Sequence, residues 1–272
     1  MAAGRVVFIS GVSSGIGKAC YEHFSKPGYV VVGTVRKGVE GSDGAAARSL
    51  VRMDLLDDES IRRAVEWTIG AHARIDVLIN NAGVSLVGSL EDTSIEEAKL
   101  QFDVNFWGTV KLIKAVLPVM REQGHGHIVN IGSLAGVFAL PFQAFYSGSK
   151  YAVEGISEAL SMEVKPFGIK VTIIEPGDFD TPLTQNRVVA KQARGDSRYA
   201  DRFEKTLAII ERGESRGESP ARIPALIERV IHARNPRLRY RIGKNRDLFA
   251  ASLSALLPRR AFEKLLMDYF GL

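Results

Sequence analysis

Three side chains that can move a proton stand close together in the second half of the chain. Tyr146 and Lys150 are four residues apart in a stretch with a helical pattern, so they share one face of that helix. A tyrosine with an ordinary pKa of about 10 is a poor base at neutral pH, but a lysine ammonium one turn away favours the phenolate and lowers that pKa. Ser133 lies just past an apolar run, 127–132. Such a set can give a proton to a carbonyl oxygen or take one from an alcohol.

A glycine-rich turn near the N-terminus points to a ligand that contains phosphate. Residues 10–17 read SGVSSGIG, directly after one apolar run and at the start of a helical pattern. Glycines there let the backbone approach a pyrophosphate, and a helix N-terminus offers unpaired N–H groups to it. The spacing is G-x-x-x-G-x-G, and by itself this motif also fits a plain tight turn. The candidate binding residues are Gly11, Ser13, Ser14, Gly15, Ile16 and Gly17.

The end of the second apolar run bears on which dinucleotide binds. It reads Val35-Arg36-Lys37, without the acidic residue that would hold a ribose 2′-hydroxyl. The Arg36 guanidinium can instead pair with a 2′-phosphate through its planar fork. The sequence therefore favours NADP(H) over NAD(H) as the cofactor, and the alternative is a surface arginine on a turn.

These residues depend on elements that must bring them to one place. Short β-branched runs predict strands buried on both faces, and helical patterns separate them. This alternation predicts α/β architecture, a doubly wound parallel sheet (Rossmann fold) with ligands at the carboxyl ends of its strands. The expected strands are 5–10, 29–35, 50–54, 75–80, 127–132, 170–175 and an edge strand 238–243, and the expected helices are 15–25, 57–71, 95–121 and 145–165.

In this order and spacing, the motifs resemble those of the short-chain dehydrogenase/reductase family over about residues 5–185. Small departures are Ser10, where the family usually has threonine, and Gly148, where alanine is common, and neither threatens activity. The matching motifs are the glycine turn, Asn80-Asn81-Ala82-Gly83, Asn105, Ser133, Tyr146 with Lys150, and Pro176-Gly177 with Thr181.

The resemblance implies a role for each of these side chains. Tyr146 would be the general acid/base, Lys150 would lower its pKa and hold the nicotinamide ribose, and Ser133 would hydrogen-bond the substrate oxygen. Asn105 would hold a water that links Lys150 to solvent. The hydride chemistry belongs to the nicotinamide. The other implied contacts of NADP(H) are Asp54 at the adenine amino group, Leu55, Asn81, Ala82 and Gly83 in the cleft, Pro176, Gly177, and Thr181 at the carboxamide.

The later part of the chain resembles, more loosely, the hydroxysteroid and retinol dehydrogenase-like branch. The segments concerned are 175–181 (EPGDFDT), 238–243 (LRYRIG) and the apolar tail. They suggest an apolar steroid-, retinoid- or lipid-like substrate, interconverted between an alcohol and a ketone or aldehyde. The polar, Arg-rich segment 178–220 is expected to form a lid over it, and the alternative is a solvated pair of surface helices. We expect pocket walls at Leu134, Val137, Phe138, Phe142 and Phe179.

Composition and charge set the broad class. The hydrophobic fraction is 46% and the charged fraction 25%, as in ordinary globular proteins, so we expect one domain, 1–272, with a small helical extension at about 221–272. Residues 1–186 carry 17 basic and 21 acidic side chains, and residues 187–272 carry 19 and 10. The single cysteine, Cys20, is expected in the core, and it fits a reducing compartment. No signal peptide and no spanning segment are recognisable, so we expect a cytoplasmic protein.

Several weaker signals have a plainer interpretation. His125 and His127 lack a third metal ligand nearby. The basic lid carries no nucleic-acid-binding motif, and its charges alternate in sign, so no nucleic-acid partner is expected. The helical apolar spacing of 249–257 and 262–266 favours packing against the core or a partner subunit over membrane contact. A homo-oligomer is expected through 95–121 and 145–165, as in relatives.

Two other function classes remain compatible with the sequence. One is a cofactor-binding redox sensor without turnover, against which the complete set Ser133, Tyr146 and Lys150 argues. The other is a membrane-associated lipid-carbonyl reductase that docks its basic, apolar C-terminus on anionic lipid.

Overall fold

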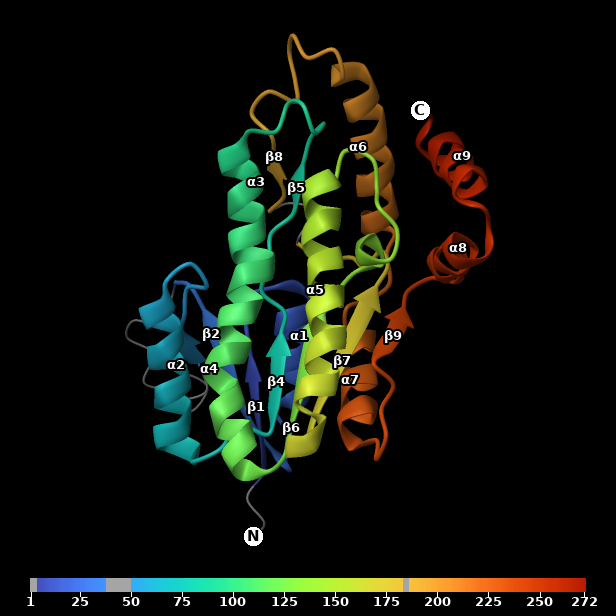
Figure 1. Ribbon diagram of the computed structural model, residues 1–272. Helices are drawn as coiled ribbons and strands as arrows, with labels where there is room; N and C mark the ends of the chain where they lie inside the picture. The colour runs from blue at the N-terminus through green and yellow to red at the C-terminus, as the bar shows by residue number, and fades with distance from the viewer. Residues whose placement is uncertain (1–3, 38–49, 183–185) are drawn as a thin grey trace.

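A seven-stranded, wholly parallel sheet forms the centre of the protein (Figure 1). The computed structural model describes residues 4–37, 50–182 and 186–272. The strand order is β3-β2-β1-β4-β6-β7-β9, and all seven expected strands are confirmed. Their bounds are β1 (Arg5–Ile9), β2 (Tyr29–Val35), β3 (Leu50–Arg52), β4 (Val77–Asn80), β6 (Gly126–Ile131), β7 (Ile169–Pro176) and β9 (Arg239–Ile242).

Helices cover both faces of this sheet, which gives the predicted doubly wound fold. On one face lie α2 (Asp58–His72), α4 (Gly108–Gln123) and α5 (Ala144–Glu163), and on the other lie α1 (Gly15–Phe24) and α7 (Arg222–His232). The Asp57 side chain caps α2 by accepting from the backbone N–H groups of Glu59 and Ser60. A side-chain cap of this kind satisfies donors that the helix itself leaves open.

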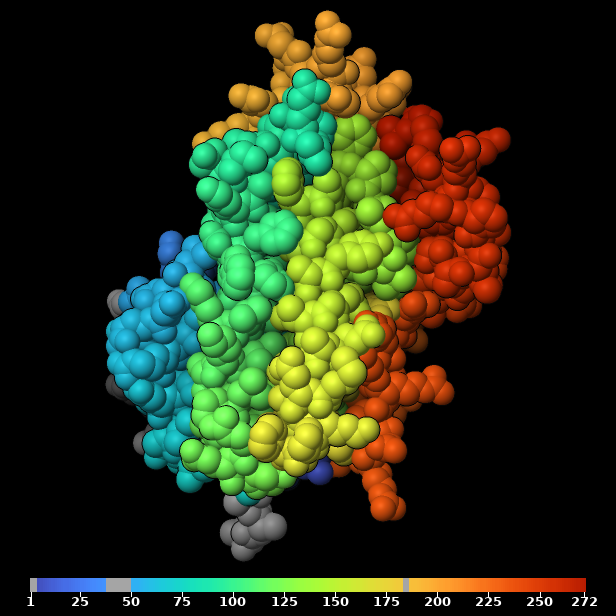
Figure 2. All heavy atoms as spheres, viewed as in Figure 1, coloured from blue at the N-terminus to red at the C-terminus, as the bar shows by residue number. Residues whose placement is uncertain are grey.

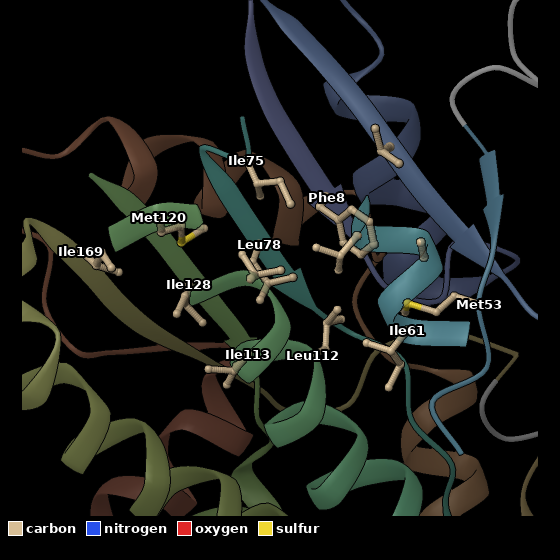
Figure 3. Packing of buried hydrophobic residues seen from close by; sticks show 14 of the residues in the cluster. Phe8, Met53, Ile61, Ile75, Leu78, Leu112, Ile113, Met120, Ile128 and Ile169 are labelled. Carbon is tan, nitrogen blue, oxygen red and sulfur yellow. The ribbon is translucent and has the colours of Figure 1, made fainter. Parts of the chain in front are cut away.

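The strands alternate their side chains between two hydrophobic cores. Phe8, Leu78 and Ile128 face α4, where Figure 3 shows them beside Leu112 and Ile113. The residues next to them on the strands belong to the second core, under α1 and α7, because successive strand residues point to opposite faces. Each fully buried side chain of this size contributes about 1.5–3 kcal/mol to stability, so the sheet is a rigid support for the loops at its ends.

The strand order creates a crevice at the carboxyl ends of the central strands β1 and β4. The chain runs outward from β1 through β2 to β3, then returns to place β4 on the other side of β1. Loops after β1 and β4 therefore diverge in opposite directions, and the gap between them is the usual ligand position in folds of this class.

The structure corrects the expectation of one continuous helix over 95–121. The segment forms α3 (Ile95–Phe102), then a π-helical turn (Asp103–Trp107), then α4. A capping box between Ser94 and Glu97 starts α3. Single π-helical turns inside α-helices are rare and are frequent at functional sites, and this one contains Asn105.

The lid contains elements that the sequence pattern did not show, whereas the C-terminal extension is helical, as expected. The short strands β5 (Leu86–Val87) and β8 (Val188–Val189) pair as a second, two-stranded sheet, and α6 (Ala200–Ser215) follows. Near the C-terminus, α8 (Asn245–Leu256) and α9 (Arg259–Phe270) lie along one side of the molecule (Figure 2). Ala251 and Phe262 pack on Leu134 and Phe138, which confirms the expectation of packing against the core.

The remaining weak signals resolve as structural residues. Cys20 is fully buried in the core, as expected, and burial raises its pKa to about 12. His127 is buried in β6, and its Nε2 lies 2.9 Å from the Thr172 hydroxyl oxygen. No cluster of three metal-binding side chains and no helix suited to cross a membrane occurs within the described parts of the chain.

Candidate active site

A large cavity of about 930 Å³ opens at the carboxyl ends of the strands. Its walls include the segments that follow β1, β2, β3, β4, β6 and β7, together with parts of α5, α6, α8 and α9. Among the predicted catalytic and cofactor-binding residues, Gly17 alone does not line this cavity. The predicted residues that do are Gly11, Ser13, Ser14, Gly15, Ile16, Arg36, Asp54, Leu55, Asn81, Ala82, Gly83, Asn105, Ser133, Tyr146, Lys150, Pro176, Gly177 and Thr181.

The glycine turn is shaped for close approach of a ligand to the backbone. Gly11 has φ +73°, and a Cβ there would lie 2.8 Å from the Cβ of Ala82. Gly17 has a packing role instead, because a Cβ at that position would collide with the Gly11 carbonyl oxygen and the Asn81 side chain. The N-cap residue Ser14 makes no side-chain cap, so the first N–H groups of α1 stay available to an anion.

Hydrogen bonds fix this turn to the end of β4. The Asn81 amide donates to the carbonyl oxygens of Ser10 (3.0 Å) and Gly11 (2.9 Å). In return the Ser10 hydroxyl accepts from the backbone N–H groups of Asn81 (2.9 Å) and Ala82 (3.1 Å). Serine therefore serves at position 10 where the family usually has threonine, because the hydroxyl is the group in use.

Two cations stand where β2 ends. Arg36 and Lys37 are exposed, and both line the cavity beside Ser13 and Ser14. The wall thus combines two positive charges with the open N-terminus of α1. This donor set can hold an anionic ligand.

Ser133 and Tyr146 meet at the cavity wall opposite the glycine turn. Ser133 follows β6 and starts a 3₁₀ turn (Leu134–Gly136), whose Ala135 N–H it caps at 3.1 Å. Tyr146 lies in the first turn of α5, and the side chains of Ser133 and Tyr146 are hydrogen-bonded. A substrate carbonyl oxygen placed between the two hydroxyls would be in reach of both.

The pKa of Tyr146 differs from the sequence expectation. Burial raises this pKa, while the hydrogen bond from Ser133 and the charge of Arg187 act in the lowering direction. The Lys150 ammonium lies 5.9 Å from the Tyr146 ring centroid and donates to the Ile131 carbonyl oxygen at 2.8 Å. The expected lowering by Lys150 is therefore not seen, because burial dominates and the ammonium is held by a backbone carbonyl.

Lys150 itself is buried. Burial lowers its pKa to about 8, and the charge of Glu154, one turn further along α5, opposes this lowering. Glu154 is held in turn by Arg239, whose Nε donates to it at 2.8 Å. The amine can therefore change its charge near neutral pH, which suits a group that passes protons.

Asn105 is buried in the π-helical turn and holds the segment after β4. Its Oδ1 accepts from the Val84 N–H at 2.8 Å, and its Nδ2 donates to the Val84 carbonyl at 3.0 Å. Nδ2 also lies 3.3 Å from the hydroxyl oxygen of Ser149, the neighbour of Lys150. The side chain thus links three segments that line the cavity.

The lid contributes a charged wall that sequence reasoning missed. Glu214 of α6 lines the cavity and accepts from the Arg187 guanidinium at 2.6 Å. Asp178 and Asp247 also line it, and both contact Arg246 at 3.3 Å. No local motif marks these residues, since they come from four separate segments. Within its described part, the segment 178–220 thus lines the cavity through residues that follow β7 and through α6. That this segment is a substrate lid stays a prediction.

The apolar wall agrees with the sequence only in part. Leu134, Phe138 and Phe179 line the cavity, whereas Val137 and Phe142 do not. Phe142 packs on Phe203 instead, with ring centroids 5.7 Å apart, and Val137 packs behind Leu134. The wall is completed by the C-terminal helices, through Phe249, Ala250, Leu253, Phe262, Leu265, Leu266, Tyr269 and Phe270.

Known proteins are similar to this chain both in sequence and in fold. Residues 5–192 match the model of the family described as short chain dehydrogenase. The chain belongs to the short-chain dehydrogenase family. It is 41% identical over 268 residues to 3-ketodihydrosphingosine reductase of Bacteroides thetaiotaomicron, covering 98% of each chain. It is 36% identical over 256 residues to retinol dehydrogenase 8 of Bos taurus, covering 88% of this chain and 81% of that one.

A solved structure resembles this short-chain dehydrogenase over nearly its whole length. The crystal structure of a short-chain dehydrogenase from Streptomyces avermitilis superposes with a TM-score of 0.82 at 32% identity, covering 98% of this chain and 97% of that one. The protein is therefore an oxidoreductase of this family. The matches to the Bacteroides reductase and to the Streptomyces structure, each over 98% of this chain, include the lid and both C-terminal helices, most of which lie beyond the family match at 5–192.

Proposed function

We propose that this short-chain dehydrogenase is an NADP(H)-dependent reductase that converts a ketone on a lipid-like substrate to an alcohol. The observation that carries the proposal is the cavity itself. One wall holds Ser133, Tyr146 and Lys150, a second holds the phosphate-binding turn, and a third is apolar and built from α8 and α9. A hydride donor and a long apolar ketone can therefore meet at the Tyr146 hydroxyl.

The proton chemistry is compatible with reduction. Burial raises the pKa of Tyr146, and a phenol that keeps its proton can donate it to the oxygen that becomes the alcohol. Ser133 would hydrogen-bond the same oxygen, and Lys150 would hold the nicotinamide ribose and resupply a proton on the side of Asn105, as the family resemblance implies. When bound, NADPH supplies the hydride.

The family resemblance supplies the cofactor contacts that we assign, and the position of these residues on the cavity wall supports them. The open N-terminus of α1, after Gly15, would hold the pyrophosphate, and Arg36 with Lys37 would hold the 2′-phosphate. Asp54 and Leu55, which follow β3, would contact the adenine. Asn81, Ala82 and Gly83 would line the cofactor cleft, and Pro176, Gly177 and Thr181 would hold the carboxamide.

The apolar wall and the relatives support a lipid over a compact polar substrate. One relative is named for 3-ketodihydrosphingosine and another for retinol. The apolar residues from α8 and α9 extend the cavity away from Tyr146 and give an alkyl chain a surface to lie on.

A turnover assay tests this function. Purified protein is mixed with NADPH or NADH and with a panel of long-chain ketones, steroid ketones, retinal and short ketones, and the nicotinamide absorbance is followed. We expect NADPH oxidation with the long-chain ketones, 3-ketodihydrosphingosine among them. Binding of NADPH without oxidation in the presence of any carbonyl compound would instead support a redox sensor.

Exposed apolar side chains on the C-terminal helices favour a membrane-associated form of the same enzyme as the second candidate. Phe249 is 63% exposed and Leu256 is 78% exposed, and Arg259 and Arg260 follow directly. Sedimentation with anionic vesicles decides between the two: Leu256→Asp should lower the bound fraction if this face contacts lipid. If wild type and Leu256→Asp both remain in the supernatant, α8 and α9 serve as a wall of the substrate cavity and do not contact lipid.

A further inference from the structure

The cavity is lined by as many cations as carboxylates, but three of the carboxylates lie close to one another: Asp247 and Glu214 both act on Asp178. Asp178 and Asp247 share the single guanidinium of Arg246, with contacts of 3.3 Å each. Glu214 is paired with Arg187. Three carboxylates in this group thus face two guanidinium groups. Burial, and after it the charges of Asp247 and Glu214, raises the pKa of Asp178 to about 6.

Two further charges lie at the edge of this group without changing its balance. Glu211, one turn before Glu214 and half exposed, is 3.8 Å from Arg187. Lys244 acts on Asp178 from the other side, and its ammonium contacts the Arg216 carbonyl oxygen. With both included, the carboxylates still outnumber the cations by one.

Arg187 fixes the Glu214 carboxylate in place. The Arg187 side chain is 3% exposed, and its Nε and Nη1 have no hydrogen-bond partner within the part of the chain that the structure describes. Burying a guanidinium in this way costs free energy that its one short contact only partly offsets. The pair is therefore a built feature of the cavity wall, with the carboxylate on the ligand side.

This wall lies next to the reacting position. Glu214 and Tyr146 line the same cavity, and the charges of Glu214 and Arg187 both act on the Tyr146 hydroxyl. Ile209 and Ile210, one turn before Glu214 on α6, line the cavity as well. A substrate whose ketone meets Tyr146 therefore shares the cavity with Glu214, near enough for the charge of Glu214 to act on the reacting hydroxyl, and its apolar remainder can lie along the C-terminal helices.

We propose that Glu214, held by Arg187, is the specificity-determining residue that binds a protonated amine next to the ketone of an amphiphilic substrate. This inference rests on the proposed reductase function and sharpens its substrate class to long-chain amino ketones. An ammonium supplies the positive charge that the wall lacks and donates a charge-assisted hydrogen bond to the carboxylate.

Matched substrates and a matched variant test the proposal. The probes are 3-ketodihydrosphingosine, which carries an amine beside its ketone, and 1-hydroxyoctadecan-3-one, which lacks only that amine. Loss of one charge-assisted hydrogen bond predicts that Glu214→Gln lowers kcat/KM for the amino ketone by about 10- to 100-fold more than it lowers kcat/KM for the other ketone. The control Glu211→Gln removes a carboxylate from the same helix outside the cavity, and it should leave both values unchanged.

Several outcomes decide the matter. Equal kcat/KM of the wild-type enzyme for the two ketones, or an equal loss for both in Glu214→Gln, overturns the proposal. If Glu214→Gln does not fold, Glu214→Asp is the substitute, because it keeps the charge but moves it back by one methylene group. This variant should lower kcat/KM for the amino ketone only. Turnover of 1-hydroxyoctadecan-3-one without preference for the amine refutes only this inference, whereas no NADPH oxidation with either compound refutes the reductase function as well.

Discussion

Asn105 offers a prediction that separates a structural role from a catalytic one. Its side chain makes three contacts: Oδ1 accepts from Val84 N–H, and Nδ2 reaches the Val84 carbonyl and the Ser149 hydroxyl. Gln101, one turn earlier, holds the same segment by accepting from the Leu86 N–H at 2.7 Å and donating to the Val84 carbonyl at 2.9 Å. Only Asn105 lines the cavity.

The contacts set the size of the expected stability change. Each buried hydrogen bond contributes about 1 kcal/mol net, and an N–H left unpaired adds to the loss. Asn105→Ala should therefore lower the free energy of unfolding by about 3 kcal/mol and Gln101→Ala by about 2 kcal/mol. For a domain of this size, these losses lower Tm by roughly 6 °C and 4 °C.

The value of kcat should then distinguish Asn105→Ala from Gln101→Ala. With NADPH and a reducible ketone, Gln101→Ala should retain kcat within about threefold, whereas Asn105→Ala should lose at least about tenfold because the proton path at Lys150 is broken. Thermal unfolding and initial rates on the same preparations give both quantities. If the two variants lose kcat equally, Asn105 acts only as a structural clamp. If Tm does not change in either variant, the hydrogen-bond argument is wrong.

Three further predictions concern the cofactor turn and the core. Arg36→Asp should raise KM for NADPH by about 10- to 100-fold and change that for NADH little, and an unchanged cofactor preference in initial rates would remove the 2′-phosphate argument. Gly17→Ala adds a Cβ that collides with the Gly11 carbonyl oxygen, so NADPH binding in a fluorescence titration should weaken, whereas Gly155→Ala, with nothing within 4 Å, should bind as wild type does. Burial lowers the pKa of His127 from 6.5 to about 3, so the unfolded chain takes up a proton that the folded protein refuses, and stability falls as pH drops from 6.5 towards 3. Urea unfolding at pH 7 and pH 5 should show a smaller loss for His127→Gln, and an equal loss would contradict the buried, neutral histidine.

The sequence predicts the sheet well because strands and site residues are local signals. Buried runs such as 127–132 show their β-branched composition directly, and the residues after each run converge at one edge of a parallel sheet. The sequence alone therefore predicts that Ser133, Tyr146 and Arg36 lie at the ligand site. The edge strand β9 was also predictable, because apolar and charged residues alternate over 238–242, as in a half-buried strand.

What the sequence could not show depends on packing between distant segments. Glu214 is one of several acidic residues in a polar helix, and only the fold brings it beside Tyr146. Phe142 is an aromatic residue of the kind that lines apolar pockets, but it packs on Phe203. The pKa of Tyr146 was misjudged because burial is a tertiary property, whereas the four-residue spacing to Lys150 is a local one.

Tyr146→Phe is the most direct test of the central claim that Tyr146 is the proton donor in a nicotinamide-dependent ketone reduction. The substitution removes one oxygen atom and leaves the ring, so the fold and the phosphate-binding turn should be unchanged. We expect NADPH to bind with wild-type affinity and the rate of ketone-dependent NADPH oxidation to fall by about 100- to 10,000-fold, the usual contribution of a general acid. Ketone reduction within about tenfold of the wild-type rate in this variant would contradict the account.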